Sequence, residues 1–255
     1  MAEEPDNEAS GQDAFVPVND LLVMISGESA SGKSASLRNI KNQERWMYLN
    51  CEAGKKLPFK NKFHQIIVTD PYQVISAMEY VQGNPEYDGI IVDTLTFLLD
   101  MYESKYIYGA ADGRQAWGNF QQYFKELMQD KVAQSDKSVI FLAHTRSEYD
   151  EKALETKTSI PVKGALKNNG IEAYFSTVVS TKKVSLKDLE PYKSDLLTIT
   201  EDDEILGFKY VFQTRLTKKT TGERIRAPMG MFSKEQTYID NDAGMLLEYL
   251  KQYYA

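Results

Sequence analysis

Residues 21–35 read "LLVMISGESASGKSA" and join an apolar segment to a loop rich in glycine and serine. The apolar segment predicts a buried strand, and from Gly27 to Ser34 the stretch follows the spacing G-x-x-x-x-G-K-[ST]. The two glycines let backbone N–H groups close around an anion, and a helix after the loop presents its positive N-terminus to the same charge. The stretch therefore predicts a phosphate-binding loop between a strand and a helix.

The polar residues of this loop have distinct expected roles. Lys33 is expected to reach the β- and γ-phosphates of a nucleotide, and the Ser34 hydroxyl is expected to ligate Mg²⁺. We therefore expect ATP and Mg²⁺ as cofactors. The loop residues expected to bind the nucleotide are Gly27, Glu28, Ser29, Ala30, Ser31, Gly32, Lys33, Ser34 and Ala35.

The composition indicates one globular domain after an acidic tail. The 255 residues are 42% hydrophobic and 26% charged, which is enough apolar material for a core. Residues 1–20 carry six acids and no base, so we expect a disordered tail there and a single domain over 21–255. Without that tail the net charge of −7 falls close to neutral, which is compatible with a local basic surface.

The sequence lacks the patterns of membrane and secreted proteins. It holds no run of eighteen apolar residues, so no membrane span is expected, and residues 1–20 lack the pattern of a secretory signal. The single cysteine, Cys51, excludes an internal disulfide and suits a reducing cytoplasm. Two histidines and one cysteine are too few for a zinc cluster.

Strand-like and helix-like segments alternate along most of the chain. The expected strands are 21–26, 45–50, 63–70, 89–94 and 138–145, with further strands in 173–186 and 208–233, the latter as a hairpin with "TTGE" at its turn. The expected helices are 33–41, 71–82, 95–108, 116–134 and 243–255. Continuous apolar strands that alternate with helices predict an α/β fold, in which a mainly parallel twisted sheet carries helices on both faces.

Two carboxylates are expected beside the phosphate loop. "GIIVDT" delivers Asp93 at the carboxyl end of a buried strand, where ligands bind in such sheets, so Asp93 is expected to hold Mg²⁺ through water. Thr94 follows at the position where many ATPases carry the glutamate that activates the attacking water. Glu52, at the end of the strand in "WMYLNCEAG", is the best candidate for that base, and an ordinary surface acid is the alternative interpretation.

A histidine ends another buried strand, "VIFLAHT". In a parallel sheet His144 is expected at the same edge as Lys33, Glu52 and Asp93. There it would contact the γ-phosphate and relay its presence to the loop that follows. A purely structural histidine is the alternative interpretation.

Together these segments resemble the core of the RecA-type recombinases, which are RecA-like P-loop NTPases. "YLNCEAG" is similar to the segment with that family's catalytic glutamate, which falls on Glu52, and "VIFLAHTR" to its sensor strand, with His144 where many members have glutamine. "TRLTKKTTGERIRAPMG" resembles the late hairpin that reaches the neighbouring subunit's ATP, which implies a catalytic role for Arg224. The resemblance covers roughly residues 21–232. A core of this size resembles the phage-encoded Sak-type single-strand annealing ATPases.

The resemblance implies an ATPase that binds single-stranded DNA and pairs complementary strands in phage DNA metabolism. In the family, the loops after the sensor strand bind DNA, and here they fall at 146–170. Cationic side chains can neutralise phosphates and a tyrosine offers a stacking face for a base. The residues expected to contact DNA are Arg146, Tyr149, Lys152, Lys157, Lys163 and Lys167. Four acids lie between residues 148 and 155, so a solvated loop of mixed charge is the alternative interpretation.

Members of that family assemble head to tail, which implies a homo-oligomer, either ring or filament, with ATP between subunits. Phe15, in the apolar segment "AFVPV" of the tail, is expected to anchor such a contact, and a single-strand-binding protein is a further expected partner. Three other functions stay open: a helicase motor or loader of the same fold, a P-loop small-molecule kinase, and a nucleotide-gated binding module. The kinase is disfavoured because such enzymes carry an arginine-bearing lid and residues 95–135 hold one arginine, Arg114.

Overall fold

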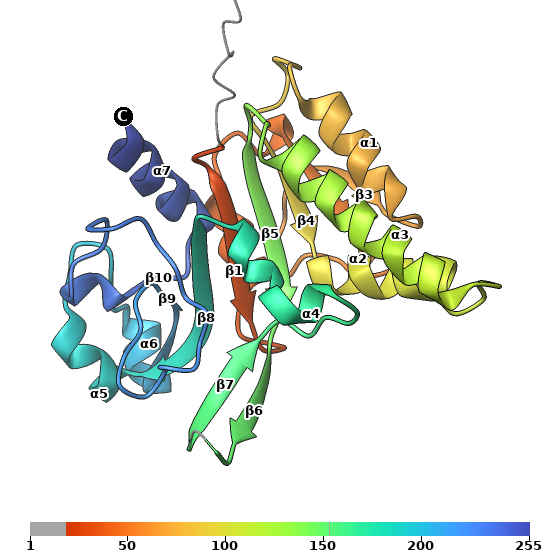
Figure 1. Cartoon of the computed structure of the whole chain (residues 1–255). Coiled ribbons are helices and arrows are strands. Elements are labelled where there is room, and N and C mark those ends of the chain that lie inside the picture. Colours follow the sequence, from red (N-terminus) through yellow and green to blue (C-terminus); the bar gives the residue numbers. More distant parts are fainter. Residues whose placement is uncertain (1–18, 153) are drawn as a thin grey trace, which may run out of the picture.

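Eight strands form one sheet in the part of the chain that the computed structural model describes, residues 19–152 and 154–255 (Figure 1). The strand order is β10-β9-β8-β1-β5-β4-β2-β3. These strands are β1 (Leu22–Gly27), β2 (Trp46–Asn50), β3 (His64–Ile67), β4 (Gly89–Asp93), β5 (Ser138–His144), β8 (Thr177–Ser185), β9 (Phe208–Gln213) and β10 (Tyr238–Asp240). Neighbours from β8 to β3 are parallel, whereas β9 pairs antiparallel with both β8 and β10.

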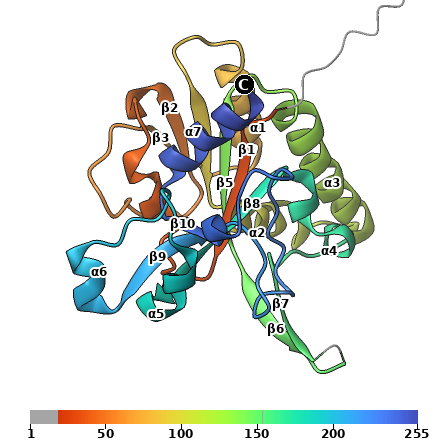
Figure 2. The ribbon, with the colours of Figure 1, turned by 90° about the vertical axis from the view of Figure 1, so that its left-hand side faces the viewer.

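Helices pack on both faces of this sheet (Figure 2). The first three helices cover one face, and the last helix covers the other together with a 3₁₀ helix at Ser34–Asn39. The α-helices are α1 (Tyr72–Val81), α2 (Leu95–Tyr102), α3 (Gly113–Lys125), α4 (Leu166–Asn169), α5 (Leu186–Leu189), α6 (Glu201–Leu206) and α7 (Ala243–Tyr254).

Successive side chains of the central strands pack into two separate hydrophobic cores, one on each face of the sheet. Met24 of β1 packs with apolar side chains of α1, α2 and α3, and its neighbour Ile25 packs with those of α7 on the opposite face. A strand buried on both faces must be apolar at nearly every position, which explains the continuous apolar runs in the sequence. The predicted α/β class, a mainly parallel sheet covered on both faces, is confirmed.

The predicted helices exist but differ in length and type. The helix expected at 33–41 is the short 3₁₀ helix Ser34–Asn39, because Ile40 is extended and Asn42 takes a left-handed φ of 51°, which asparagine tolerates. The helix expected to begin at residue 116 begins at Gly113, because the Asp112 side chain caps it. Both α2 and α3 continue into π-helical turns, Glu103–Ile107 and Glu126–Val132.

The late hairpin predicted around "TTGE" is wrong. Residues 214–233 form an irregular segment with two isolated bridges, Glu223 to Thr158 and Arg226 to Val178. The Gln213 side chain at the end of β9 donates to Arg215 O and Thr220 Oγ1, so the chain folds back before a second strand can form. The C-terminal antiparallel extension is built from β8, β9 and β10 instead.

The polar stretch at 146–170 begins with a hairpin rather than a loop. β6 (Arg146–Asp150) and β7 (Glu155–Ser159) pair antiparallel in a separate two-stranded sheet. Figure 1 shows this hairpin projecting beyond the end of β5. Because its side chains are mostly exposed on both faces, the hairpin lacks the apolar alternation by which a strand is predicted.

The packed part of the chain begins before residue 21. Asn19 is buried and its side chain donates to Val132 O and Lys137 O, so this residue of the predicted tail packs against the domain. Phe15, the predicted oligomer anchor, lies outside the described residues. None of the described helices has the length and hydropathy to cross a membrane.

Candidate nucleotide-binding site

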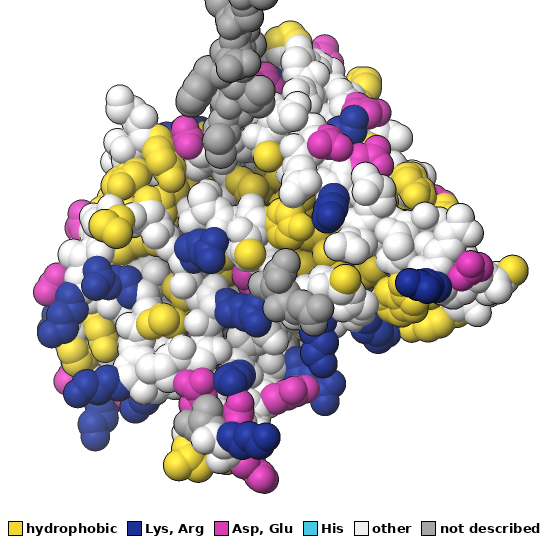
Figure 3. All heavy atoms as spheres, viewed as in Figure 1, with side chains coloured by type: hydrophobic (Ala, Val, Ile, Leu, Met, Phe, Trp, Pro, Cys, Tyr) yellow, Lys and Arg dark blue, Asp and Glu magenta, His cyan; other side chains and the backbone are white. Residues whose placement is uncertain are grey.

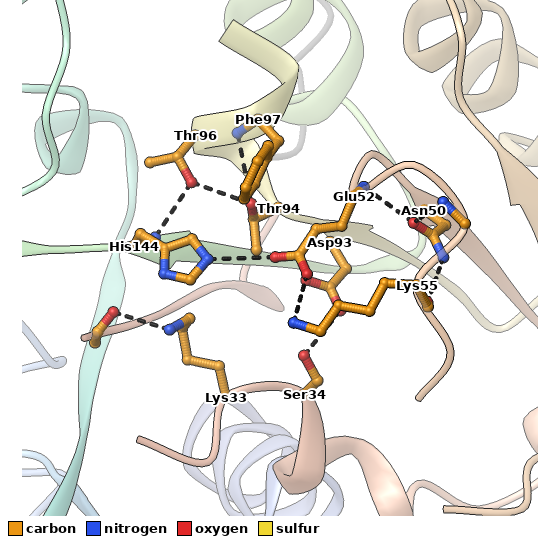
Figure 4. Close-up of polar contacts among 12 residues, drawn as sticks. Lys33, Ser34, Asn50, Glu52, Lys55, Asp93, Thr94, Thr96, Phe97 and His144 are labelled. Atoms are coloured by element: carbon orange, nitrogen blue, oxygen red, sulfur yellow. Dashed lines mark hydrogen bonds and ion pairs between the residues drawn. The ribbon is translucent and has the colours of Figure 1, made fainter. Parts of the chain in front are cut away.

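The carboxyl ends of β1, β5, β4 and β2 meet at one edge of the sheet and border a cavity of about 580 Å³. β5 lies between β1 and β4, and His144 at its end faces Glu52 across this edge (Figure 4). The predicted residues that line the cavity are Ser29, Ala30, Gly32, Lys33, Ser34, Ala35, Glu52, Asp93 and His144. The other loop residues predicted to bind nucleotide, Gly27, Glu28 and Ser31, line a neighbouring pocket.

The backbone of the phosphate loop requires its glycines. A side chain at Gly27 would meet the Thr181 hydroxyl at 2.1 Å, and Gly32 has a φ of +99°. Lys33 is buried, and its Nζ donates to Gly27 O at 2.9 Å and to Glu28 O at 2.7 Å. Burial lowers the pKa of Lys33 to about 8. An anionic phosphate beside this ammonium would favour its charged form.

Asp93 and Ser34 form the candidate metal site. Asp93 Oδ2 accepts hydrogen bonds from Ser34 Oγ at 3.0 Å and from Tyr48 OH at 2.7 Å. Its Oδ1 is buried and has no hydrogen-bond partner among the described residues, and burial raises the pKa of this carboxyl. Mg²⁺ in nucleotide sites takes one or two protein oxygens and completes its shell with phosphate oxygens and water. Ser34 Oγ and the unpartnered Asp93 Oδ1 fit this requirement, so these two residues would hold the ion.

Asn50, the last residue of β2, holds the turn that carries Glu52. Asn50 is fully buried, its Oδ1 accepts from Glu52 N at 3.0 Å and Gly54 N at 3.3 Å, and its Nδ2 donates to Lys55 O at 2.8 Å. Ala53 and Gly54 take left-handed φ values of 52° and 80°, which tightens the turn. The side chains of Glu52 and Lys55 therefore both reach the cavity.

The Glu52 carboxylate lies between His144 and Lys55 (Figure 4). Its Oε1 is 3.3 Å from His144 Nε2 and its Oε2 is 2.8 Å from Lys55 Nζ. The hydrogen bond with His144, reinforced by Lys55, lowers the pKa of Glu52 to about 2, so this carboxyl is ionised at neutral pH. The backbone N–H of His144 donates to Thr96 Oγ1 at 3.4 Å, and the Thr96 hydroxyl lies 3.0 Å from that of Thr94. The segment after Asp93 thus supports the end of β5.

Arg224 lies away from the cavity of its own chain. Its Nη1 donates to the buried Glu172 Oε2 at 3.1 Å, and it is not among the residues that line the cavity. Its side chain is 46% exposed. Arg224 therefore does not contact a nucleotide bound in the same subunit.

Four of the six residues predicted to contact DNA lie on the projecting hairpin or at its tip. Tyr149 is 62% exposed, Arg146 pairs with Glu148, and Lys157 pairs with Asp150 at 2.5 Å. Figure 3 shows basic, acidic and hydrophobic side chains together on this projection. The hairpin thus carries both the acidic and basic side chains and the exposed Tyr149 ring on which the two interpretations of this stretch depend.

The other two predicted DNA contacts lie outside the hairpin. Lys163 Nζ pairs with the buried Glu103 at 2.6 Å and lies 3.0 Å from Tyr108 OH, so its charge is compensated within the chain. Lys167 is exposed on α4.

Ten described residues that line the cavity were not predicted from the sequence, among them Tyr48, Lys55, Tyr210 and Asn241. Asn241 Nδ2 donates to Gly32 O at 3.0 Å, while its Oδ1 is buried without a hydrogen-bond partner among the described residues. Lys55 could have been found from "EAGK", since a tight turn returns the fourth side chain toward the first. No local signal marks Tyr210 or Asn241, which reach the loop from more than 170 positions away in the sequence.

A family model described as an AAA domain matches residues 19–207. The chain belongs to this family. No curated protein matches this chain. Among solved structures, flagellar accessory protein FlaH from Methanocaldococcus jannaschii is similar at 14% identity and a TM-score of 0.37, over 77% of this chain and 78% of FlaH. A similarity this distant does not extend the role of FlaH to this chain.

This protein is therefore an AAA-type P-loop ATPase domain. The family generally uses ATP and Mg²⁺, and the cavity offers the groups that this chemistry requires. These are a buried lysine for phosphate, a hydroxyl and a carboxylate for the metal, and a second, ionised carboxylate beside them.

Proposed function

We propose that this chain hydrolyses ATP in a manner stimulated by single-stranded DNA and promotes annealing of complementary strands, as a Sak-type protein of phage DNA metabolism. One observation carries the proposal. The strand that presents His144 to Glu52 continues, after Thr145, directly into the projecting hairpin at Arg146. A displacement at the nucleotide site would therefore move, within two residues, an exposed surface of mixed charge that carries the Tyr149 ring.

A second contact joins the same two regions. Ser147 Oγ of the hairpin lies 3.4 Å from Glu28 Oε1 of the phosphate loop. Glu28 O in turn accepts from Lys33 Nζ at 2.7 Å. If a phosphate draws Lys33 away from this carbonyl, the support of the hairpin changes with it. The hairpin is thus connected to the nucleotide site through the chain and through the loop.

The proposed chemistry uses the residues of the cavity. Glu52 takes a proton from the attacking water while the new P–O bond forms and the bond to the leaving ADP breaks. Lys33 stabilises the negative charge of the phosphate oxygens, and His144 contacts the γ-phosphate. Mg²⁺ held by Ser34 and Asp93 would neutralise further phosphate charge.

We also propose a homo-oligomer with ATP between subunits. Because Arg224 does not reach the cavity of its own chain and its side chain is partly exposed, it is available to a neighbouring subunit once it leaves Glu172. Ring and filament both satisfy this arrangement.

The test is ATP turnover with and without single-stranded DNA, together with an annealing assay on complementary oligonucleotides. We expect DNA to raise turnover, and we expect Lys33→Ala and Glu52→Gln to abolish it, the latter while still binding ATP. Tyr149→Ala should weaken DNA binding by about 1–3 kcal/mol, because a stacked ring contributes that much. Tyr80→Ala is the matched control, because it removes an exposed tyrosine that lies on α1, away from the hairpin.

The same assays separate the alternatives. Directional unwinding of a forked duplex, without annealing, would favour a helicase motor or loader. Phosphoryl transfer to a nucleoside or nucleotide, with no effect of DNA on turnover, would favour a kinase. Tight ATP binding with negligible turnover under all conditions would favour a nucleotide-gated binding module.

A further inference from the structure

Lys55 is a second lysine beside the phosphate site, supplied by the turn after β2. Its Nζ lies 2.8 Å from Glu52 Oε2, and its side chain lines the nucleotide cavity. The two partners differ in freedom: the Lys55 side chain is 69% exposed, whereas that of Glu52 is 10% exposed. The ammonium can therefore move to another partner in the cavity while the carboxylate stays in place.

The backbone beneath Lys55 is fixed. Asn50 Nδ2 donates to Lys55 O at 2.8 Å, and Lys55 N donates to Glu52 O at 3.1 Å. Only the side chain has to rotate for the ammonium to leave Glu52. A long flexible arm on a fixed base suits a group that exchanges between two anions.

Four other described cations line the cavity: Lys33, Arg38, Lys56 and Lys209. Lys33 donates to loop carbonyls, Arg38 donates to Ala35 O and Asn241 O, and Lys209 pairs with Asp203. Lys56 follows Lys55 on the same turn. Lys55 is the lysine that holds the carboxylate expected to act as base. Its position couples the occupancy of the phosphate site to the freedom of that carboxylate.

We propose that Lys55 binds the terminal phosphate of ATP from within the same subunit and, by leaving Glu52, frees Glu52 Oε2 to accept the proton of the attacking water. The part concerning the proton rests on the proposed role of Glu52 as base. ADP lacks the γ-phosphate that would compete for the ammonium, so Lys55 stays on Glu52 when ADP is bound. The ion pair thereby restrains the base until a triphosphate is present.

The step is an ordinary hydrolysis. The water oxygen forms a bond to the γ-phosphorus, the bond to the ADP oxygen breaks, and the proton of the water passes to Glu52. Lys55 stabilises the phosphoryl oxygens during this transfer and returns to Glu52 once phosphate has left.

The proposal predicts that Lys55 distinguishes ATP from ADP. We expect Lys55→Ala to weaken ATP binding about tenfold, as for loss of one charge-assisted contact, and to leave ADP binding within about twofold. Turnover should fall on the order of 100-fold, the loss typical of one transition-state donor. Lys55→Arg should recover part of both. Lys60→Ala removes the same charge from the same loop outside the cavity and is the matched control.

A double-mutant cycle makes the test independent of turnover. If the two anions compete for Lys55, Glu52→Gln should bind ATP more tightly than the unaltered protein, and the added Lys55→Ala should abolish that gain. Equal losses of ATP and ADP affinity in Lys55→Ala, or a gain in Glu52→Gln that survives Lys55→Ala, would overturn the proposal.

The pH profile separates this inference from the proposed role of Glu52. Losing the cation raises the pKa of Glu52 in the free enzyme, so the acid limb of the kcat/KM profile should move to higher pH in Lys55→Ala. An unmoved acid limb, with Glu52→Gln inactive, refutes the control of Glu52 by Lys55 and leaves the base intact. If Glu52→Gln turns over ATP normally, the base is wrong, and the preference for ATP over ADP still decides whether Lys55 binds the terminal phosphate.

Discussion

Asn50→Ala should lower both stability and turnover, because one buried amide supports the whole turn that carries Glu52. The side chain makes three hydrogen bonds to backbone groups, two through Oδ1 and one through Nδ2, at 2.8 to 3.3 Å. Alanine removes all three and leaves the backbone groups of Glu52, Gly54 and Lys55 without these partners. The turn then no longer fixes the carboxylate beside His144.

The magnitude follows from these contacts. A net contribution of about 1 kcal/mol per hydrogen bond gives roughly 3 kcal/mol for the three. Water can reach the freed groups of the partly exposed turn, which reduces the loss to roughly 2–3 kcal/mol. For a chain of this size, each kcal/mol lowers Tm by about 2–4 °C, so we expect a decrease of roughly 4–12 °C.

Urea unfolding and steady-state turnover measure the two effects. Asn61→Ala, an exposed asparagine on the same loop, should change the free energy of unfolding by less than about 1 kcal/mol. ADP affinity should survive in Asn50→Ala because the phosphate loop is untouched. A destabilisation below about 1 kcal/mol, or one no larger than that of Asn61→Ala, would refute the idea that Asn50 holds the turn.

Three further outcomes are expected. Affinity for ATP should be constant below about pH 8 and fall above that pH. The pKa of Lys33 is lowered to about 8, so above this pH the free lysine is neutral and must take up a proton when ATP binds. Titration with a fluorescent ATP analogue across this pH range measures the effect. Tyr48→Phe removes a donor to the Asp93 carboxylate and should raise the Mg²⁺ concentration for half-maximal turnover, whereas Tyr123→Phe, which loses a bond to a backbone carbonyl, should not. Deletion of residues 1–18 should reduce the mass of the assembly in light scattering, and an unchanged mass would exclude the tail as its anchor.

The five strands from β1 to β5 and most of the phosphate site could be predicted from the sequence. The phosphate loop is a local motif, so its spacing alone predicts where the anion binds. Apolar runs that end in Asp93 and His144 predict buried strands, and parallel strands place their carboxyl ends at one edge. This arrangement of parallel strands was enough to predict that Glu52 would lie near Asp93 and His144. Residue identity and strand direction were enough here, because each of these side chains comes directly after the strand that positions it.

The folded chain shows which groups act on those residues and how the later strands pair, and neither follows from local sequence patterns. The hydroxyl of Tyr48 reaches Asp93 from a neighbouring strand, and Asn241 reaches Gly32 from the far end of the chain. The pattern of an apolar strand does not show that one of its tyrosines meets a buried carboxylate. Likewise, the side chain of Gln213 folds the chain back where strand-forming residues had predicted a hairpin. These contacts depend on which distant segments pack together, and spacing along the chain carries no information about that.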